Sequence, residues 1–406
     1  MTEFAIPEYL IRDEYLQLPI VLRFLHDHSL PLSSNLKEAV EEIQCYANIS
    51  QENKDVVISW LSKIVREGSK EFCFKRILEY DEVLLSPKKT AELLKKAYSV
   101  CLNKSLLEYT NTGERRLVNF RIIGEDRVKK IELTFSQLFL CAMGKEKQSG
   151  TRIYPVFIDV DLEMGYIISR QRAKSTLFEY SESNPELMSE FRINTKKHAA
   201  NVIKEVAEVL ELSIADAESM RYETYSMIFK LYNDLTFTPK CIKDVVEEQK
   251  HSATKFVNSF FENLSLTPIN KGKAIRDILI IIEKYLSIDR NSEELFINDR
   301  PAYVTKISSD NDEDFTRIET MSMKETPLQT TEAFFDSKKS IENAKQCKKI
   351  KMVFKRRNQK YFGSSNQLVV EVGFGDKCSY IKTFAYAEEE DIQNVLQTVL
   401  VAFGQQ

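Results

Sequence analysis

Glycine and proline are scarce in this sequence, which contains 11 and 10 of them among 406 residues. Such scarcity excludes collagen-like repeats and argues against long irregular loops. The glycine-rich patterns that cradle phosphates, GxxxxGK[ST] and GxGxxG, are absent, and so are the GxSxG and HExxH patterns of hydrolases and zinc proteases. The sequence therefore lacks the signatures of the common nucleotide-binding and hydrolytic enzymes.

Long apolar runs and charged tails are also absent. No uninterrupted apolar stretch reaches the ~18 residues that a membrane crossing needs, and no basic segment followed by an apolar one opens the chain. The 57 Lys and Arg residues nearly balance the 61 Asp and Glu residues, which leaves a formal net charge of −4. With 43% apolar residues the chain can bury real cores. We therefore expect a soluble, cytoplasmic protein that does not associate with a membrane.

Cysteine and histidine are present in small numbers and in unfavourable patterns. The seven cysteines are odd in number and far apart, so they form neither a disulfide framework nor a CxxC half-site for zinc. The four histidines include His26 and His28, which would point about 160° apart on a helix and cannot grip one metal ion together. Neither residue type is expected to define a site.

The spacing of apolar residues predicts an α+β protein. Its predicted parts are a mainly helical N-terminal domain (1–110), a central antiparallel β domain (111–180), a helical bundle (181–298) and a C-terminal αβββα domain (299–406). Within the first part, Glu71–Leu78 is predicted as a strand. Within the second, Phe135–Met143 is predicted as a short helix that lies across the sheet. The C-terminal domain is expected to contain helix Thr331–Lys345, strands Lys349–Arg356, Gln367–Phe374 and Ser379–Phe384, and helix Glu388–Phe403.

The densest cluster of one charge lies in residues 345–360, where eight of sixteen residues are Lys or Arg. Because side chains alternate along a strand, Ile350, Met352 and Phe354 are expected in the core and the cations on the opposite face. A cationic face suits contacts with phosphates. Lysines also protect exposed edge strands from aggregation, so an edge strand is the alternative interpretation. The predicted nucleic-acid-binding residues are Lys349, Lys351, Lys355, Arg356, Arg357 and Lys360.

Three carboxylates form the strongest candidate for catalysis. Asp159, Asp161 and Glu163 are two residues apart, so a continuing strand would place them on one face. Clustered carboxylate oxygens can hold Mg²⁺ or Mn²⁺ for phosphoryl chemistry. The alternative is a solvated hairpin turn that closes at Gly165, because carboxylates are common at such turns.

From these features we predict a non-enzymatic intracellular scaffold or recognition subunit that binds nucleic acid or a protein partner and uses no cofactor. The absence of metabolic motifs is compatible with a role in host defence, and association of identical chains is compatible with the sequence. The alternative function is that of a metal-dependent phosphodiesterase or nuclease, in which Asp159, Asp161 and Glu163 bind Mg²⁺ or Mn²⁺.

Overall fold

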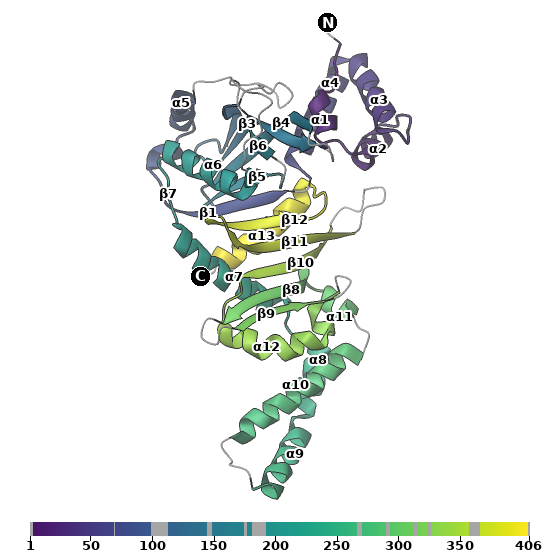
Figure 1. The fold of residues 1–406 in the computed structure, drawn as a ribbon, viewed down its shortest axis with the longest axis vertical. Helices are drawn as coiled ribbons and strands as arrows, with labels where there is room; N and C mark the ends of the chain where they lie inside the picture. Colours follow the sequence, from purple (N-terminus) through teal and green to yellow (C-terminus); the bar gives the residue numbers. More distant parts are fainter. Residues whose placement is uncertain are drawn as a thin grey trace. The chain divides into compact units, whose positions relative to one another are not determined.

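The protein has an α+β fold, as predicted, with numerous helices and antiparallel strands (Figure 1). The computed structural model describes residues 3–68, 70–98, 113–143, 148–173, 177–180, 192–265, 270–289, 293–311, 316–322, 326–356 and 366–404. None of the helices in these ranges combines the length and the apolar character that a membrane crossing requires.

The chain divides into two compact units. The first contains residues 1–222, 356–368 and 374–396, and the second contains residues 223–355, 369–373 and 397–406. The boundary predicted at residue 110 therefore falls inside the first unit, and the predicted C-terminal domain contributes residues to both units.

The first unit is built on an antiparallel sheet with the strand order β2-β3-β4-β5-β1-β12, to which β6 adds beside β3 and β7 beside β1. Its strands are β1 (Glu71–Glu79), β2 (Arg116–Ile123), β3 (Lys130–Met143), β4 (Gln148–Asp161), β5 (Tyr166–Gln171), β6 (Leu177–Glu179), β7 (Ser213–Ile214) and β12 (Cys378–Thr383). The strand predicted at Glu71–Leu78 is confirmed as β1. It pairs with β5 on one side and β12 on the other, so it lies inside the sheet.

Helices cover both faces of this sheet. They are α1 (Glu8–Arg12), α2 (Leu18–Asp27), α3 (Leu36–Ile49), α4 (Gln51–Arg66), α5 (Pro87–Ala97) and α6 (Thr195–Val209), with a short 3₁₀ helix, η1 (Glu82–Leu85). On one face, α5 and α6 pack against β-strand residues that include Phe135 and Ile158. On the other, α1 to α4 pack against a set that includes Leu138 and Phe157. The unit therefore has three layers and two hydrophobic cores.

Local capping signals account for where several helices begin. The Asn35 side chain accepts a hydrogen bond from the Lys37 N–H at the start of α3, and Ser50 accepts one from the Asn53 N–H at the start of α4. Asn and Ser are favoured there because their side-chain oxygens satisfy amides that have no partner within the helix.

The second unit combines a smaller sheet with a set of helices. Its strands follow the order β11-β10-β8-β9, in which β8 pairs antiparallel with both β9 and β10. The elements are α7 (Ala217–Leu235), α8 (Lys240–Glu248), α9 (Lys250–Asn263), α10 (Lys271–Asp289), α11 (Glu293–Ile297), β8 (Ala302–Asn311), β9 (Thr316–Met321), η4 (Leu328–Thr330), α12 (Glu332–Ala344), β10 (Lys349–Lys355), β11 (Gln367–Gly375) and α13 (Glu389–Gly404), and of these α7, β11 and α13 contain residues of both units. The five elements predicted for the C-terminal αβββα part are confirmed as α12, β10, β11, β12 and α13.

The helix predicted at Phe135–Met143 is wrong, because these residues form the second half of β3. They pair in unbroken register with β4, from Phe135 opposite Val156 to Met143 opposite Gln148. The prediction failed because the strand is covered on both faces: Leu138 belongs to one hydrophobic core and Phe139 to the other. Such a strand loses the polar alternation that distinguishes strands from helices.

Candidate functional site

The predicted cationic strand is β10, and its apolar face lies where expected. Ile350, Met352 and Phe354 are buried, whereas Lys355 is exposed and Lys349 and Lys351 are half-buried. Arg357 and Lys360 lie outside the described residues.

Two of the cations around β10 are already engaged. Lys349 forms an ion pair with Glu371 at 3.4 Å. Arg356 is buried, donates to the Gln367 carbonyl at 3.3 Å and lies 3.7 Å from an Asp391 carboxylate oxygen. The edge-strand interpretation is wrong, because β8 and β11 border β10 on its two sides. Nucleic-acid binding by this strand remains a prediction.

The three candidate metal ligands occupy different environments. Asp159 is 4% exposed, whereas Glu163 is exposed and pairs with Lys129 at 3.0 Å. Asp161 stabilises the hairpin turn between β4 and β5, where its carboxylate accepts the Met164 N–H at 2.8 Å and Gly165 has a φ of 74°. Among the described residues, no group of three or more His, Cys, Asp or Glu side chains is arranged to hold a metal ion. The hairpin turn is therefore as expected for Asp161 and Glu163, but Asp159 is not a solvated turn residue.

Three cations surround the Asp159 carboxylate. Arg66 of α4 approaches it at 2.6 Å, Lys130 of β3 at 3.2 Å and Arg170 of β5 at 3.5 Å. Burial alone would raise the pKa of Asp159, but the attraction of these cations outweighs it and lowers the pKa below its usual value. A carboxylate held this way is poorly suited to bind a divalent cation, because the metal would have to displace three positive charges.

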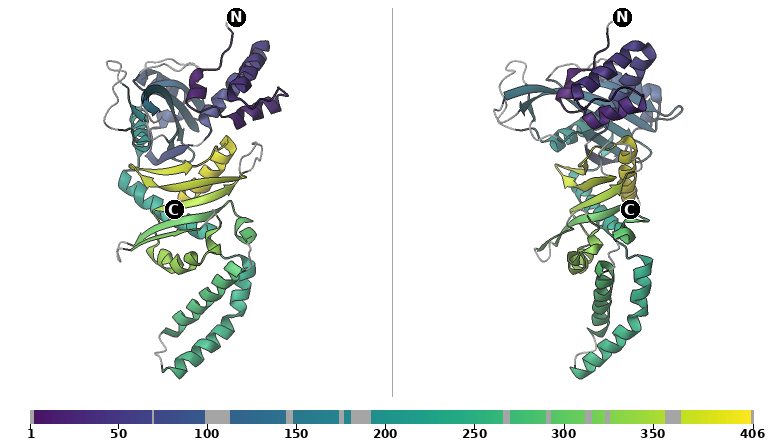
Figure 2. Two further views of the ribbon diagram at one scale, coloured as in Figure 1. Left: turned by 45° about the vertical axis from the view of Figure 1, so that its right-hand side comes forward. Right: turned by 90° about the vertical axis from the view of Figure 1, so that its right-hand side faces the viewer.

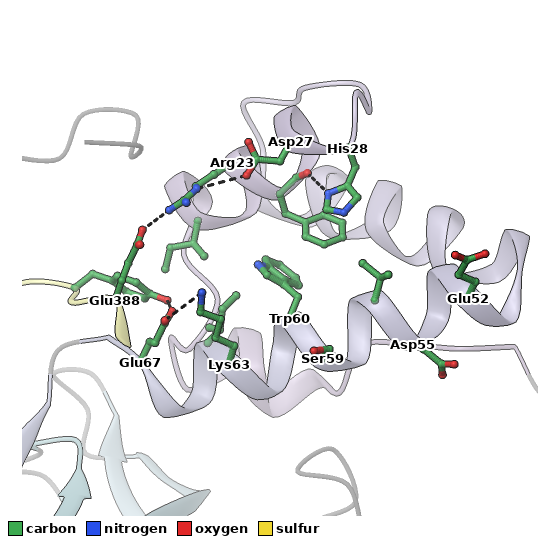
Figure 3. A pocket seen from close by; sticks show the side chains of 15 residues that line it. Arg23, Asp27, His28, Glu52, Asp55, Ser59, Trp60, Lys63, Glu67 and Glu388 are labelled. Carbon is green, nitrogen blue, oxygen red and sulfur yellow. Dashed lines mark hydrogen bonds and ion pairs between the residues drawn. The ribbon is translucent and has the colours of Figure 1, made fainter. Parts of the chain in front are cut away.

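A different feature has the geometry of a binding site. It is a groove of about 760 Å³ in the first unit, which we call the α2–α4 groove, and its floor is aromatic (Figure 3). The rings of Phe24 on α2 and Trp60 on α4 are 4.4 Å apart between centroids. His28 stacks on Phe24 at 4.0 Å and is fixed by a 2.9 Å hydrogen bond between its Nδ1 and the Phe24 carbonyl.

The rim of the groove is predominantly acidic. Five carboxylates and two cations line it, which gives a net charge of −3 without His28. The carboxylates are those of Asp27, Glu52, Asp55, Glu67 and Glu388, and the cations are Arg23 and Lys63. A cationic ligand is therefore favoured over an anionic one.

The charges are unevenly distributed along the groove. At one end Arg23 pairs with Glu388 and, at 3.5 Å, with Asp27, while Lys63 lies 3.6 Å from Glu67 (Figure 3). At the other end lie Glu52 and Asp55, both exposed and neither ion-paired within the described part of the chain. The free negative charge is therefore concentrated at the second end.

Glu67 connects the closed end of the groove to the C-terminal segment. Its carboxylate accepts the Glu389 N–H at 2.8 Å and the Tyr386 hydroxyl at 2.9 Å. Burial raises the pKa of Glu67, and the two hydrogen bonds offset only part of that rise. Glu67 therefore holds the segment with Tyr386 and Glu388 against the groove.

Sequence analysis did not identify this groove. A local signal was nevertheless present, because α4 carries acidic residues at 52 and 55, and Glu67 directly after its end, beside an apolar stripe that contains Val56 and the single Trp of the chain. The groove residues on α2 and in segment 386–388 show no pattern in the sequence that marks a site, because they approach α4 only in the folded protein.

No protein-family model matches this chain, and no curated protein matches it either.

Proposed function

We propose that this protein is a non-enzymatic recognition subunit that binds a cationic segment of a partner protein in the α2–α4 groove. The observation that carries the proposal is the combination of an aromatic floor, Phe24 and Trp60, with an acidic rim whose carboxylates outnumber its cations.

The chemistry of the groove suits a lysine or arginine side chain. A cation over an indole ring gains about 0.5–2 kcal/mol, depending on how far it is removed from water. Glu52 and Asp55 are available to pair with its charge, because neither has an ion-pair partner among the described residues. Val56, which is 37% exposed, offers apolar surface for the stem of the side chain or for a neighbouring residue.

The groove is large enough for the side chains of a bound segment. Pockets for small molecules typically enclose about 300–1,000 Å³, and the groove holds about 760 Å³. Its lining residues lie on α2, on α4 and in the segment with Tyr386 and Glu388, so a bound segment would lie between the two helices.

The groove does not suit nucleic acid, because its carboxylates would repel phosphates. Nucleic-acid binding therefore depends on the cationic strand and remains a separate prediction, as do cytoplasmic location and host defence. A metal-dependent phosphodiesterase is not favoured, because Asp159 is occupied by three cations.

The experiment uses Trp60 fluorescence, which reports on the groove because Trp60 is the single Trp of the chain. The probes are two twelve-residue peptides free of aromatic residues, one built from Leu and Lys and the other from Leu and Glu. We expect the Lys peptide to shift the emission of Trp60 and to bind at least tenfold more tightly than the Glu peptide.

A charge reversal identifies the groove as the site. Glu52→Lys should weaken binding of the Lys peptide several-fold, whereas Glu92→Lys on α5, an exposed position outside the groove, should leave it unchanged. Equal affinity for the two peptides, or equal effects of the two substitutions, would reject the proposal.

A further inference from the structure

Helices α9 and α10 expose large apolar side chains. The two helices pack side by side in the second unit and form an arm, defined here as residues 250–265 and 270–289 (Figures 1 and 2). The exposed fractions are 62% for Phe256, 47% for Phe260 and 56% for Leu264 on α9, and 52% for Ile281 and 63% for Tyr285 on α10.

Helix geometry places these side chains on one side of the arm. On α9 the exposed Phe256 and Phe260 each precede a buried residue, Val257 and Phe261. On α10 the exposed Ile281 and Tyr285 each precede a half-buried apolar residue, Ile282 and Leu286. We assign these buried and half-buried residues to the contact between the two helices. Because the helices are antiparallel, equal displacements from the contact bring the two exposed stripes to the same side of the arm.

The face carries no charge along most of its length, although 29% of the residues in the chain are charged. Its positions are Phe256, Phe260, Leu264, Ala274, Ile278, Ile281 and Tyr285, and Lys271 precedes Ala274 in the same helical row. Depletion of charge together with enrichment in aromatic side chains is typical of the centre of a protein–protein interface. Solvent-exposed surfaces of monomers rarely contain an apolar patch of this kind.

We infer that this face binds the same face of a second copy of the chain, so that two arms form a four-helix bundle. A two-fold axis makes the contact isologous, which requires a self-complementary surface, and an uncharged apolar face meets that requirement. Two helical hairpins packed face to face are an established bundle architecture.

The area of the face is sufficient for a reversible dimer. Helix α10 has 19 residues, so the arm is about 28 Å long at 1.5 Å per residue, and two adjacent helices are about 18 Å wide. The face then measures roughly 500 Å² per copy, or ~1,000 Å² for both, which reaches the lower range of specific interfaces.

Charge at the tip of the arm sets the orientation of the two copies. Lys271, Lys273 and Arg276 lie at the start of α10, close to the tip. A parallel arrangement would bring both sets of cations together, whereas an antiparallel one separates them by most of the arm. Glu262, in the last turn of α9, offsets only one of these three charges. We therefore infer an antiparallel dimer, with the tip of each arm beside the base of the other.

Insertion of only the tip of the arm into a lipid surface would leave Ile281 and Tyr285 exposed, because they continue the apolar face toward the base. A lipid surface that covers the whole face is the competing outcome of the test.

Sedimentation equilibrium of the full chain between about 1 and 100 µM tests the proposal. The parent protein should shift from monomer to dimer across this range. Phe260→Glu should weaken dimerisation at least tenfold, whereas Met164→Glu, which introduces the same charge at an exposed apolar position in the β4–β5 turn, should not. Circular dichroism of both variants confirms that they are folded.

A monomeric parent protein at 100 µM would overturn the proposal, and so would dimerisation that Phe260→Glu leaves unchanged. Binding of the monomer to vesicles of phosphatidylcholine and phosphatidylserine, without self-association, would assign the face to lipid instead. None of these outcomes depends on the α2–α4 groove.

Discussion

The contrast between Asp159 and Asp161 gives the sharpest test of the structure. Both are aspartates of the same strand, two residues apart, but Asp159 is buried against three cations and Asp161 stabilises the adjacent turn. Removal of one partner from a buried ion pair costs about 3–5 kcal/mol, because the opposite charge stays buried without compensation. Glu132 and Glu389 remain as partners of the cations, so Asp159→Asn should destabilise the first unit by about 3 kcal/mol.

Asp161→Asn is the matched control. The amide oxygen of Asn can still accept the Met164 N–H, so this change should alter stability by less than about 0.5 kcal/mol. Urea unfolding followed by Trp60 fluorescence measures both variants, because Trp60 lies in the same unit as the two aspartates. Similar unfolding midpoints for the two variants would refute the burial and ion pairing assigned to Asp159.

The pH dependence of the same comparison adds an independent test. The folded protein lowers the pKa of Asp159, so the charged carboxylate contributes stability above the unfolded-state pKa of about 3.9. That contribution is lost as the pH falls through the lower pKa of the folded state. The stability difference between the parent and Asp159→Asn should therefore be constant from pH 7 to about 5 and become smaller below about 4.

Two further predictions concern other buried residues. Burial, with a smaller effect of Arg115, lowers the pKa of His198 to about 4. Since the unfolded-state pKa is about 6.5, protonation of His198 should cost the parent up to ~3 kcal/mol of stability as the pH falls from 6.5 to 4. His198→Phe should lack this contribution and lose correspondingly less. Urea titrations of both proteins at pH 7 and 4.5 measure this, and identical losses would contradict it. Leu396→Ala in α13 should cost about 2–5 kcal/mol because the side chain is buried; an unchanged unfolding midpoint would show that α13 is peripheral.

Local patterns determined much of the secondary structure. The αβββα order of the C-terminal part could be predicted because its patterns are local. Both α12 and α13 carry a helical apolar period, Thr331 caps α12 and acidic residues occupy the first turn of α13. In β10 the buried Ile350, Met352 and Phe354 recur at every second position. The turn at Asp161 and Gly165 is as predicted for the same reason: a residue with positive φ and a carboxylate acceptor are local requirements.

Where burial depended on distant segments, the sequence was insufficient. Helices cover both faces of β3, so Phe135–Met143 lacks the polar alternation that marks a half-exposed strand. Without that alternation the segment was predicted as a helix. The edge interpretation of β10 failed in the same way, since only the order of strands in the sheet decides which strand has two neighbours.

Both the carboxylate site and the groove depended on tertiary structure for their chemistry. The spacing of Asp159 to Asp161 made it a candidate metal ligand in the alternative function, but Arg66, which is 93 residues away in sequence, lies 2.6 Å from it in the fold. The α2–α4 groove likewise needs Arg23 and Glu388, which are 365 residues apart. Sequence spacing determines which side chains share a face of one strand or helix, because backbone geometry is local. Which charges oppose each other across elements is set by packing of the whole unit, and that packing decides whether a carboxylate binds a ligand or stabilises the fold.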